Sequence, residues 1–139
     1  MRIMGLDVGE KRIGIAISDP LGWTAQGHSV LEREKMEKDL KRIWQICQEE
    51  GVERIVVGLP INMNGSLGPK AVEAQQFAEE LGGYTKLPVE LWDERLTTKI
   101  AEKVLTREAN ISRRKRKKVI DKLAAVNILQ NYLGSRLRS

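Results

Sequence analysis

The chain has 139 residues, a formal net charge of +5 at pH 7 and a single cysteine. This length suits one domain, so we expect residues 1–139 to form a single unit around one core. One Cys and one His are too few for an internal disulfide or a structural zinc site. No apolar run reaches the roughly 18 residues of a membrane span, so we expect no membrane partner and a cytoplasmic location. The positive charge favours a polyanionic partner.

Apolar spacing and turn residues predict the elements in chain order. The predicted strands cover residues 2–8, 13–18, 23–30, 54–59 and 89–93. The predicted helices cover 34–50, a segment from Ala71 to Leu81 that ends at Gly82-Gly83, a segment from Thr97 or Thr98 to about 108, and a segment from Ser112 to about 133. Three hairpin-style strands followed by helical crossovers, in the order β-β-β-α-β-α-β-α-α, predict an α/β fold. We expect a mixed five-stranded sheet with helices on both faces.

Acidic residues stand at three places where the pattern is otherwise apolar. Asp7 lies inside the first predicted strand, Asp93 and Glu94 close the fifth, and Asp121 lies on the last helix. Burying an unpaired carboxylate in a protein costs on the order of several kcal/mol, even after the surroundings relax. A partner cation, a metal or solvent at the strand end must therefore offset the burial of Asp7.

The last helix is predicted to bring these acids together. Asp121 shares a helical face with the small and apolar residues Ala124, Ala125 and Ile128, and small residues let a helix lie close to a sheet. Three converging carboxylates repel unless a cation joins them. Oxygen ligands of this kind suit Mg²⁺ or Mn²⁺, which can activate water for attack on a phosphodiester.

Each acid taken singly has a simpler interpretation. Asp7 just before Gly9 fits a turn, and Glu94 beside Arg95 fits a surface ion pair. Asp121 lies among lysines and fits a helix salt bridge. The joint placement of the three, each near the end of its element, favours the metal site.

Four segments together resemble the YqgF family of Holliday-junction-resolvase-like proteins, which are also regarded as pre-16S rRNA nucleases. They are GLDVGEKRIGIAISD, VVGLPINMNGS, WDERLTT and RKKVIDKLAAVNILQNYL, in the same order and over nearly the whole chain. The resemblance implies a ribonuclease-H-like fold and divalent-metal-dependent cleavage of structured RNA in 16S rRNA 5′-end maturation. By position it implies Asp7, Glu94 and Asp121 as catalytic residues and ligands of Mg²⁺ or Mn²⁺. Asp93 rivals Glu94, because strand alternation lets only one of them reach the metal.

The sequence departs from this resemblance at two places. The fourth predicted strand ends in Gly58-Leu59-Pro60, where many ribonuclease-H-like nucleases carry an acid, so the second ligand must come from the fifth strand. Asn64 stands in a loop where some relatives carry aspartate, so we expect this loop to guide substrate or to order a turn.

Basic residues close to the acids are candidates for nucleic-acid binding. Lys11 and Arg12 follow Asp7, and Arg95 follows Glu94, where a guanidinium matches the geometry of a phosphate. A run of six cations precedes Asp121 by one to two helical turns and is placed to follow a nucleic-acid backbone. The run comprises Arg113, Arg114, Lys115, Arg116, Lys117 and Lys118.

Two other functions stay open at this point. A Holliday junction resolvase would act on branched DNA as a homodimer, because it cuts two strands symmetrically. A non-catalytic ribosome-assembly factor would bind precursor rRNA through the basic helix and would not need the carboxylates. An actin-like ATPase shares the opening DxG pattern, but 139 residues are too few for two domains that clamp a nucleotide.

Overall fold

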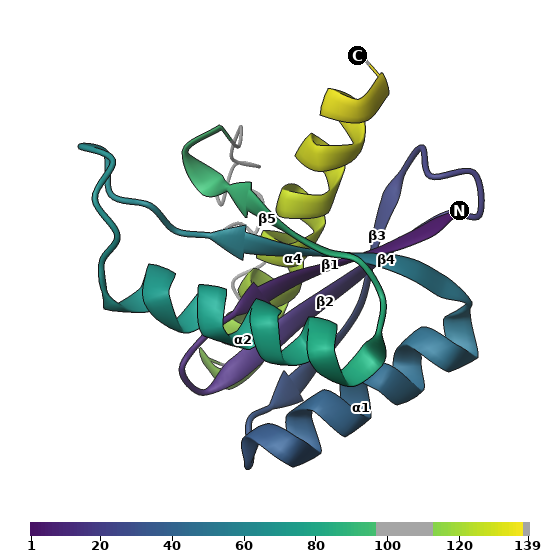
Figure 1. Cartoon of the computed structure of the whole chain (residues 1–139), viewed down its shortest axis with the longest axis horizontal. Coiled ribbons are helices and arrows are strands. Elements are labelled where there is room, and N and C mark those ends of the chain that lie inside the picture. Colours follow the sequence, from purple (N-terminus) through teal and green to yellow (C-terminus); the bar gives the residue numbers. More distant parts are fainter. Residues whose placement is uncertain (97–112, 138–139) are drawn as a thin grey trace.

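The predicted elements form in the predicted order in the part of the chain that the computed structural model describes, residues 1–96 and 113–137 (Figure 1). The described elements are β1 (Arg2–Val8), β2 (Arg12–Ser18), β3 (Ala25–Glu32), α1 (Met36–Glu50), β4 (Val52–Leu59), α2 (Pro69–Thr85), β5 (Val89–Asp93), the 3₁₀ turn η1 (Glu94–Leu96) and α4 (Arg113–Leu137). The helix predicted from Thr97 or Thr98 lies outside the described residues. So does Ser112, the predicted cap of the last helix.

The five strands form one mixed sheet in the order β3-β2-β1-β4-β5. The tight hairpins make β1, β2 and β3 antiparallel, whereas the helical crossovers make β1, β4 and β5 parallel, as each kind of connection requires. Leu6 of β1 pairs with Val57 of β4, and Leu59 pairs with Asp93 of β5. The carboxyl ends of these three strands therefore meet at one edge of the sheet.

Helices cover both faces of the sheet, as predicted: α1 and α2 lie on one face and α4 crosses the other (Figure 1). Alternate residues of β1 and β4 enter two separate cores, because successive side chains point to opposite faces. The core under α1 and α2 contains Met4, Leu6, Ile55, Val57 and Phe77. The core under α4 contains Ile3, Val56, Ala125, Ile128 and Leu129.

Glycines on the strands let α4 lie directly on the sheet. A Cβ atom on Gly14 would lie 2.0 Å from the backbone oxygen of Asp121, and one on Gly5 would lie 2.7 Å from Cβ of Leu129. Ala125, between these two contacts, is fully buried. The helix axis is therefore fixed by backbone contact, and Asp121 is carried to the sheet edge where β1 ends.

The structure corrects several predicted boundaries: β3 ends two residues later than predicted, β4 begins two residues earlier, and α4 continues to Leu137. β3 begins at Ala25 and not at residue 23, because the Asp19 carboxylate accepts the backbone N–H groups of Trp23 and Thr24 and holds both in a turn. α1 begins two residues later than predicted. α2 continues past the Gly82-Gly83 pair to Thr85, whose hydroxyl donates to the carbonyl of Leu81. Within the described ranges, no helix has both the length and the apolar character needed to cross a membrane.

Candidate active site

Asp7 lies at the end of β1 on the face that α4 covers. It shares that face with Ile3 and Gly5, which pack against the helix. Burial, and to a smaller extent the negative charge of Asp121, raise the pKa of the Asp7 carboxyl from 3.8 to about 6, against the opposing effect of the positive charge of Lys70. Within residues 1–96 and 113–137 the Asp7 carboxylate has no hydrogen bond and no ion pair. The side chain is half-buried at the end of the strand, and a bound cation would stabilise its charge.

Asp121 projects from α4 towards the same sheet edge. Its backbone oxygen faces Gly14, which is the cross-strand partner of Asp7. One oxygen of its carboxylate, Oδ2, accepts a hydrogen bond from Nε of Arg12 at 2.7 Å. Asp7 and Asp121 are therefore close enough for each charge to act on the other, with Arg12 bound to the second of them.

Glu94 is the first residue of η1, directly after β5. Its Cδ atom lies 3.2 Å from the position that a Cβ atom on Gly58 would occupy, and the Ile128 side chain of α4 reaches the same position. Gly58 follows Val57, the strand partner of Leu6, so it lies beside Asp7 in the sheet. The Glu94 carboxylate is therefore on the α4 face, where Asp7 and Asp121 also lie.

Asp93 has a different environment from Glu94. Its carboxylate accepts hydrogen bonds from Nε and Nη2 of Arg95 and from the Arg95 backbone N–H, which lower its pKa. The preceding residue, Trp92, packs edge-on against Tyr132 of α4, so strand alternation turns Asp93 away from that helix. The geometry favours Glu94 over Asp93 as the third acid on the α4 face.

The three acids share a face but do not form a ready-made coordination sphere. In the described residues, no group of three or more His, Cys, Asp and Glu side chains is close enough to hold a metal ion. Asp7 and Asp121 are brought together, and Glu94 stands beside Gly58. The donor set nevertheless fits Mg²⁺ or Mn²⁺, because all three donors are hard carboxylate oxygens and the half-buried Asp7 forms no ion pair with a described residue.

A groove of about 730 Å³ opens beside Glu94. Lys70, near the start of α2, lines this groove and also acts on the pKa of Asp7, so the groove adjoins the carboxylates. The loop above it is held by Asn64, whose side-chain oxygen accepts the backbone N–H and the hydroxyl of Ser66. Of the two roles predicted for this loop, ordering a turn is the one that these hydrogen bonds support. The lining residues are Pro60, Ile61, Asn62, Met63, Gly68, Pro69, Lys70, Glu94 and Arg95.

A model of the RuvX family, described as Holliday junction resolvase, matches residues 1–135. The chain belongs to this family. A protein of Syntrophomonas wolfei, named "Putative pre-16S rRNA nuclease", is 63% identical over 96% of this chain and 94% of its own length. A protein of Listeria innocua with the same name is 56% identical over 97% and 99%. The family predicted from the four motifs is confirmed, and the description and names are those of nucleases.

Solved structures confirm the ribonuclease-H-like fold of this RuvX chain. The Thermus thermophilus RuvC structure in complex with a Holliday junction substrate superposes with a TM-score of 0.63 at 15% identity, over 99% of this chain and 96% of that one. The fowlpox virus Holliday junction resolvase gives a TM-score of 0.57 at 14% identity, over 97% and 99%. At such identities the likeness shows the fold alone.

Some of the basic residues predicted to bind nucleic acid in this RuvX chain form ion pairs with acidic residues, and others are exposed to solvent. Arg12 and Arg95 are each bound to an aspartate of the site region. Lys11 is exposed in the β1–β2 turn. Of the run at the start of α4, Lys115 and Lys117 are exposed, Arg116 is half-buried and Lys118 pairs with Glu32 at 3.4 Å; the side chains of Arg113 and Arg114 lie outside the described residues.

Arg33 is a residue of the site region that sequence reasoning missed. Its Nη1 donates to the carbonyl of Gly9 at 3.1 Å, and its backbone N–H donates to the carbonyl of Lys11. Its Nε bonds the fully buried Asp39, and its guanidinium lies over the ring of Phe77. Arg33 therefore fixes the turn that follows Asp7. The only signal in the sequence is an aspartate on an otherwise apolar stripe of α1.

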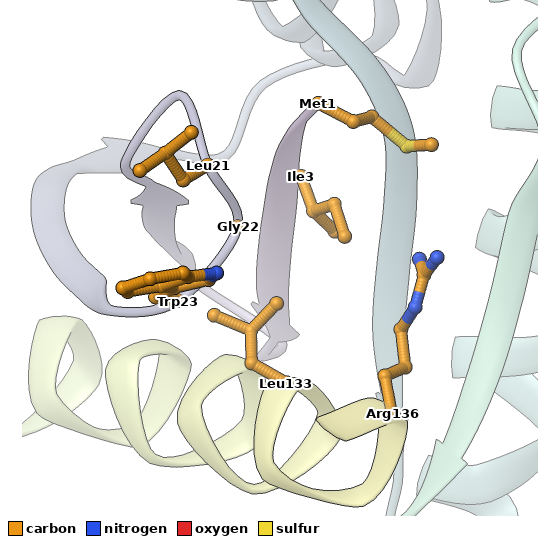
Figure 2. A pocket seen from close by; sticks show the side chains of 7 residues that line it. All are labelled: Met1, Ile3, Leu21, Gly22, Trp23, Leu133 and Arg136. Carbon is orange, nitrogen blue, oxygen red and sulfur yellow. The ribbon is translucent and has the colours of Figure 1, made fainter. Parts of the chain in front are cut away.

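A second cavity, of about 210 Å³, lies at the other end of α4 from Asp121 (Figure 2). Figure 2 shows Trp23 from the β2–β3 loop and Leu133 from α4 at its wall. None of the described residues that line it is an acid, a histidine or a cysteine, so this cavity is no part of the candidate site. Its lining comprises Met1, Ile3, Leu21, Gly22, Trp23, Leu133 and Arg136.

Proposed function

We propose that this chain is a divalent-metal-dependent nuclease that hydrolyses phosphodiester bonds, with Asp7, Glu94 and Asp121 as its catalytic carboxylates. The observation that carries this proposal is the half-buried Asp7 carboxyl beside Asp121, whose pKa is raised to about 6 by loss of solvent and by the charge of Asp121. A carboxylate held at such a cost at the carboxyl edge of a sheet is typical of a functional site. Family membership supports the same reaction class.

In this proposal each residue has a separate task. Asp7, Asp121 and Glu94 would hold Mg²⁺ or Mn²⁺ through carboxylate oxygens. When bound, such an ion lowers the pKa of a water molecule and offsets the negative charge that develops on the phosphodiester. Lys70 and Arg95 line the groove beside Glu94 and would bind the phosphates that flank the scissile bond. Arg33 would keep the turn after Asp7 in place.

We further propose structured RNA, the 5′ flank of precursor 16S rRNA, as the substrate. The names of the relatives from Syntrophomonas wolfei and Listeria innocua support this choice. The description of the family model favours a second candidate, a four-way DNA junction. Symmetric cutting of its two strands would call for a homodimer. Both substrates share the phosphodiester chemistry, so the carboxylate assignment serves either.

The decisive experiment compares the two substrates with the same purified protein. Precursor 16S rRNA with its 5′ flank and a four-way DNA junction are incubated with Mn²⁺, and the oligomeric state is measured by gel filtration. We expect cleavage of the RNA, and we expect Asp7→Asn and Asp121→Asn to abolish it without loss of the folded state by circular dichroism. Cleavage of the junction alone, by a dimer, would replace RNA by DNA as the substrate.

A control variant separates this site from a contaminating nuclease. Glu90→Gln removes a carboxylate near the start of β5 that pairs with Arg54, at the other end of the strand from Glu94, and it should leave cleavage unchanged. RNA binding that survives the loss of all three carboxylates, with no Mn²⁺-dependent cleavage in any variant or in the parent protein, would instead indicate a non-catalytic assembly factor.

A further inference from the structure

Arg12 occupies an oxygen of a candidate metal ligand. Its Nε donates to Oδ2 of Asp121 at 2.7 Å, and the two side chains are 21% and 26% exposed. The hydrogen bond to Asp121 is the largest cause of the raised pKa of Arg12. One of the two negative charges that meet at the end of β1 is therefore already neutralised by a residue of the chain itself, while Asp7 is not.

A divalent ion and this guanidinium compete for the same carboxylate. An ion bound to a carboxylate oxygen sits roughly 2 Å from it, and the Arg12 Nε lies 2.7 Å from Oδ2, so an ion on Asp121 would stand within a few ångströms of the guanidinium. Their positive charges also repel each other at such short range. Filling the site around Asp7 and Asp121 therefore favours a position of Arg12 away from Asp121.

Arg12 has other acceptors within its reach. It is the cross-strand partner of Glu32 on β3, and the charge of Glu32 acts on the Arg12 guanidinium. Glu32 itself is bound to Lys118 of the basic run on α4, so Arg12 stands between the carboxylates and that run. A guanidinium binds phosphate oxygens through paired hydrogen bonds and holds its charge throughout, which makes a backbone phosphate a strong competitor for it.

We propose that Arg12 is a positioning residue that holds Asp121 in the free protein and transfers to a backbone phosphate when nucleic acid binds, so that substrate binding frees Asp121 for the divalent ion. This inference rests on the proposed function, because it takes Asp121 as a metal ligand. A role of this kind couples the binding of the ion to the binding of nucleic acid, which a purely structural ion pair between Arg12 and Asp121 would not do. Nucleic acid raises the affinity for the ion, and the ion raises the affinity for nucleic acid by the same factor.

The first test uses Mn²⁺ alone, with free Mn²⁺ measured by electron paramagnetic resonance. Arg12→Gln removes the competing guanidinium, so this variant should bind Mn²⁺ about two- to fivefold more tightly than the parent protein, the range that loss of a partly exposed ion pair allows. Arg2→Gln is the matched control. It removes an arginine of β1 that pairs with Glu50 at 2.9 Å at the opposite end of the strand, and its Mn²⁺ affinity should equal that of the parent protein.

The second test measures the coupling directly. The affinity for a fluorescently labelled RNA hairpin with non-cleavable phosphorothioate linkages is measured by anisotropy with and without Mn²⁺. In the parent protein and in Arg2→Gln we expect Mn²⁺ to raise this affinity roughly five- to fiftyfold. In Arg12→Gln the increase should fall to less than about threefold, because Asp121 no longer needs to be freed. Arg12→Lys keeps the positive charge but lacks the planar guanidinium with its paired donors. Its Mn²⁺-dependent increase in RNA affinity should lie between those of the parent protein and Arg12→Gln.

The outcomes separate this inference from the proposed function. Absence of Mn²⁺ binding in every protein, parent included, would overturn the metal site itself. Mn²⁺ binding that Asp121→Asn abolishes, together with equal or weaker binding in Arg12→Gln, would leave the metal site standing and overturn the role of Arg12. If Arg12→Gln fails to fold by circular dichroism, the same comparison is made with Arg12→Lys, for which Mn²⁺ binding no tighter than that of the parent protein contradicts the inference.

Discussion

Gly58 of β4 lies against the carboxylate of Glu94, so that a Cβ atom on this glycine would stand 3.2 Å from Cδ of the glutamate. Gly58 is the last residue but one of β4, so this contact lies at the carboxyl end of the strand. The acid comes from the end of the neighbouring strand, and the glycine leaves the space for it. The same position touches Ile128 of α4, so the helix, the strand and Glu94 meet at one point.

The first prediction concerns the adjacent acids Glu94 and Asp93. Glu94→Gln should lower Mn²⁺-dependent cleavage by about a hundredfold or more, since even partners of metal ligands cost 10- to 100-fold. Asp93→Asn should cost less than about threefold, because Asp93 is held by Arg95 on the exposed side and such pairs contribute little. Initial rates of RNA cleavage at saturating Mn²⁺ check both. A larger loss in Asp93→Asn than in Glu94→Gln would reverse the assignment.

The second prediction concerns the space at Gly58. Gly58→Ala places a methyl group 2.5 Å from Cδ1 of Ile128 and 3.2 Å from Cδ of Glu94, and both are ends of side chains that can shift. We expect a loss of about 1–2 kcal/mol in the free energy of unfolding, typical of overpacking, and a disproportionate loss of cleavage, roughly tenfold or more, since small misplacement at a catalytic group is costly. Urea unfolding and cleavage rates at a temperature where the variant is fully folded measure the two effects separately.

The control for this substitution is Gly83→Ala. Gly83 lies inside α2, and a Cβ atom there has no heavy atom within 4 Å among those considered. Alanine should raise stability by up to about 1 kcal/mol through helix propensity and leave cleavage unchanged. Equal activity losses in the two variants would show that the contact between Gly58 and Glu94 has no role in catalysis.

Local patterns predicted most of the fold because the two-residue and 3.6-residue periods are properties of single segments. The sheet face shared by Asp7 and Asp121 also followed from such patterns, since small residues on α4 indicate close packing. The pairing of Arg12 with Asp121 joins residues 109 positions apart and depends on the exact approach of α4 to β2. No local pattern distinguishes it from the lysine salt bridge that the helix sequence favours for Asp121.

The glycine pair in α2 shows a different limit of sequence reasoning. Gly82-Gly83 resembles a helix stop, but the helix continues for two further residues. The Thr85 hydroxyl satisfies the carbonyl of Leu81, and Lys86 takes the left-handed conformation at φ 61° that a terminal glycine would otherwise supply. Tertiary packing of Leu81 in the core overrides the local preference of the glycines.

The third prediction concerns Lys70, whose charge opposes the raised pKa of Asp7 and which lines the groove beside Glu94. Lys70→Gln should weaken RNA binding roughly threefold to tenfold at moderate salt and reduce the slope of log affinity against log salt by about one. Lys86→Gln, at the far end of the same helix, is the control and should change neither quantity. Fluorescence anisotropy over a range of KCl concentrations gives both. An unchanged slope in Lys70→Gln would remove the groove from the nucleic-acid path.

The last prediction concerns the stability of the metal-free protein as a function of pH. The folded Asp7 carboxyl keeps its proton to about pH 6, whereas in the unfolded chain it ionises near pH 4. The folded state therefore binds more protons between these values, and stability falls as pH rises through that window. The shift corresponds to at most about 3 kcal/mol at neutral pH. Asp7→Asn should recover part of this lost free energy of unfolding in EDTA at pH 7.5. The gain should vanish at pH 4, where the folded parent protein carries a protonated Asp7 and the variant a neutral asparagine.

Asp19 provides a control of opposite sign, because the backbone N–H groups of Thr24 and Trp23 lower its pKa. Asp19→Asn should destabilise the protein at pH 7.5 and lose that effect as the pH falls through the carboxyl range. Denaturant unfolding in EDTA at pH 4, 6 and 7.5 measures both variants. Asp7→Asn should at the same time lose Mn²⁺-dependent cleavage, so that one substitution stabilises the fold and removes the activity. A destabilised Asp7→Asn at pH 7.5 would mean that Asp7 already has a favourable partner and is not the charge that recruits the metal.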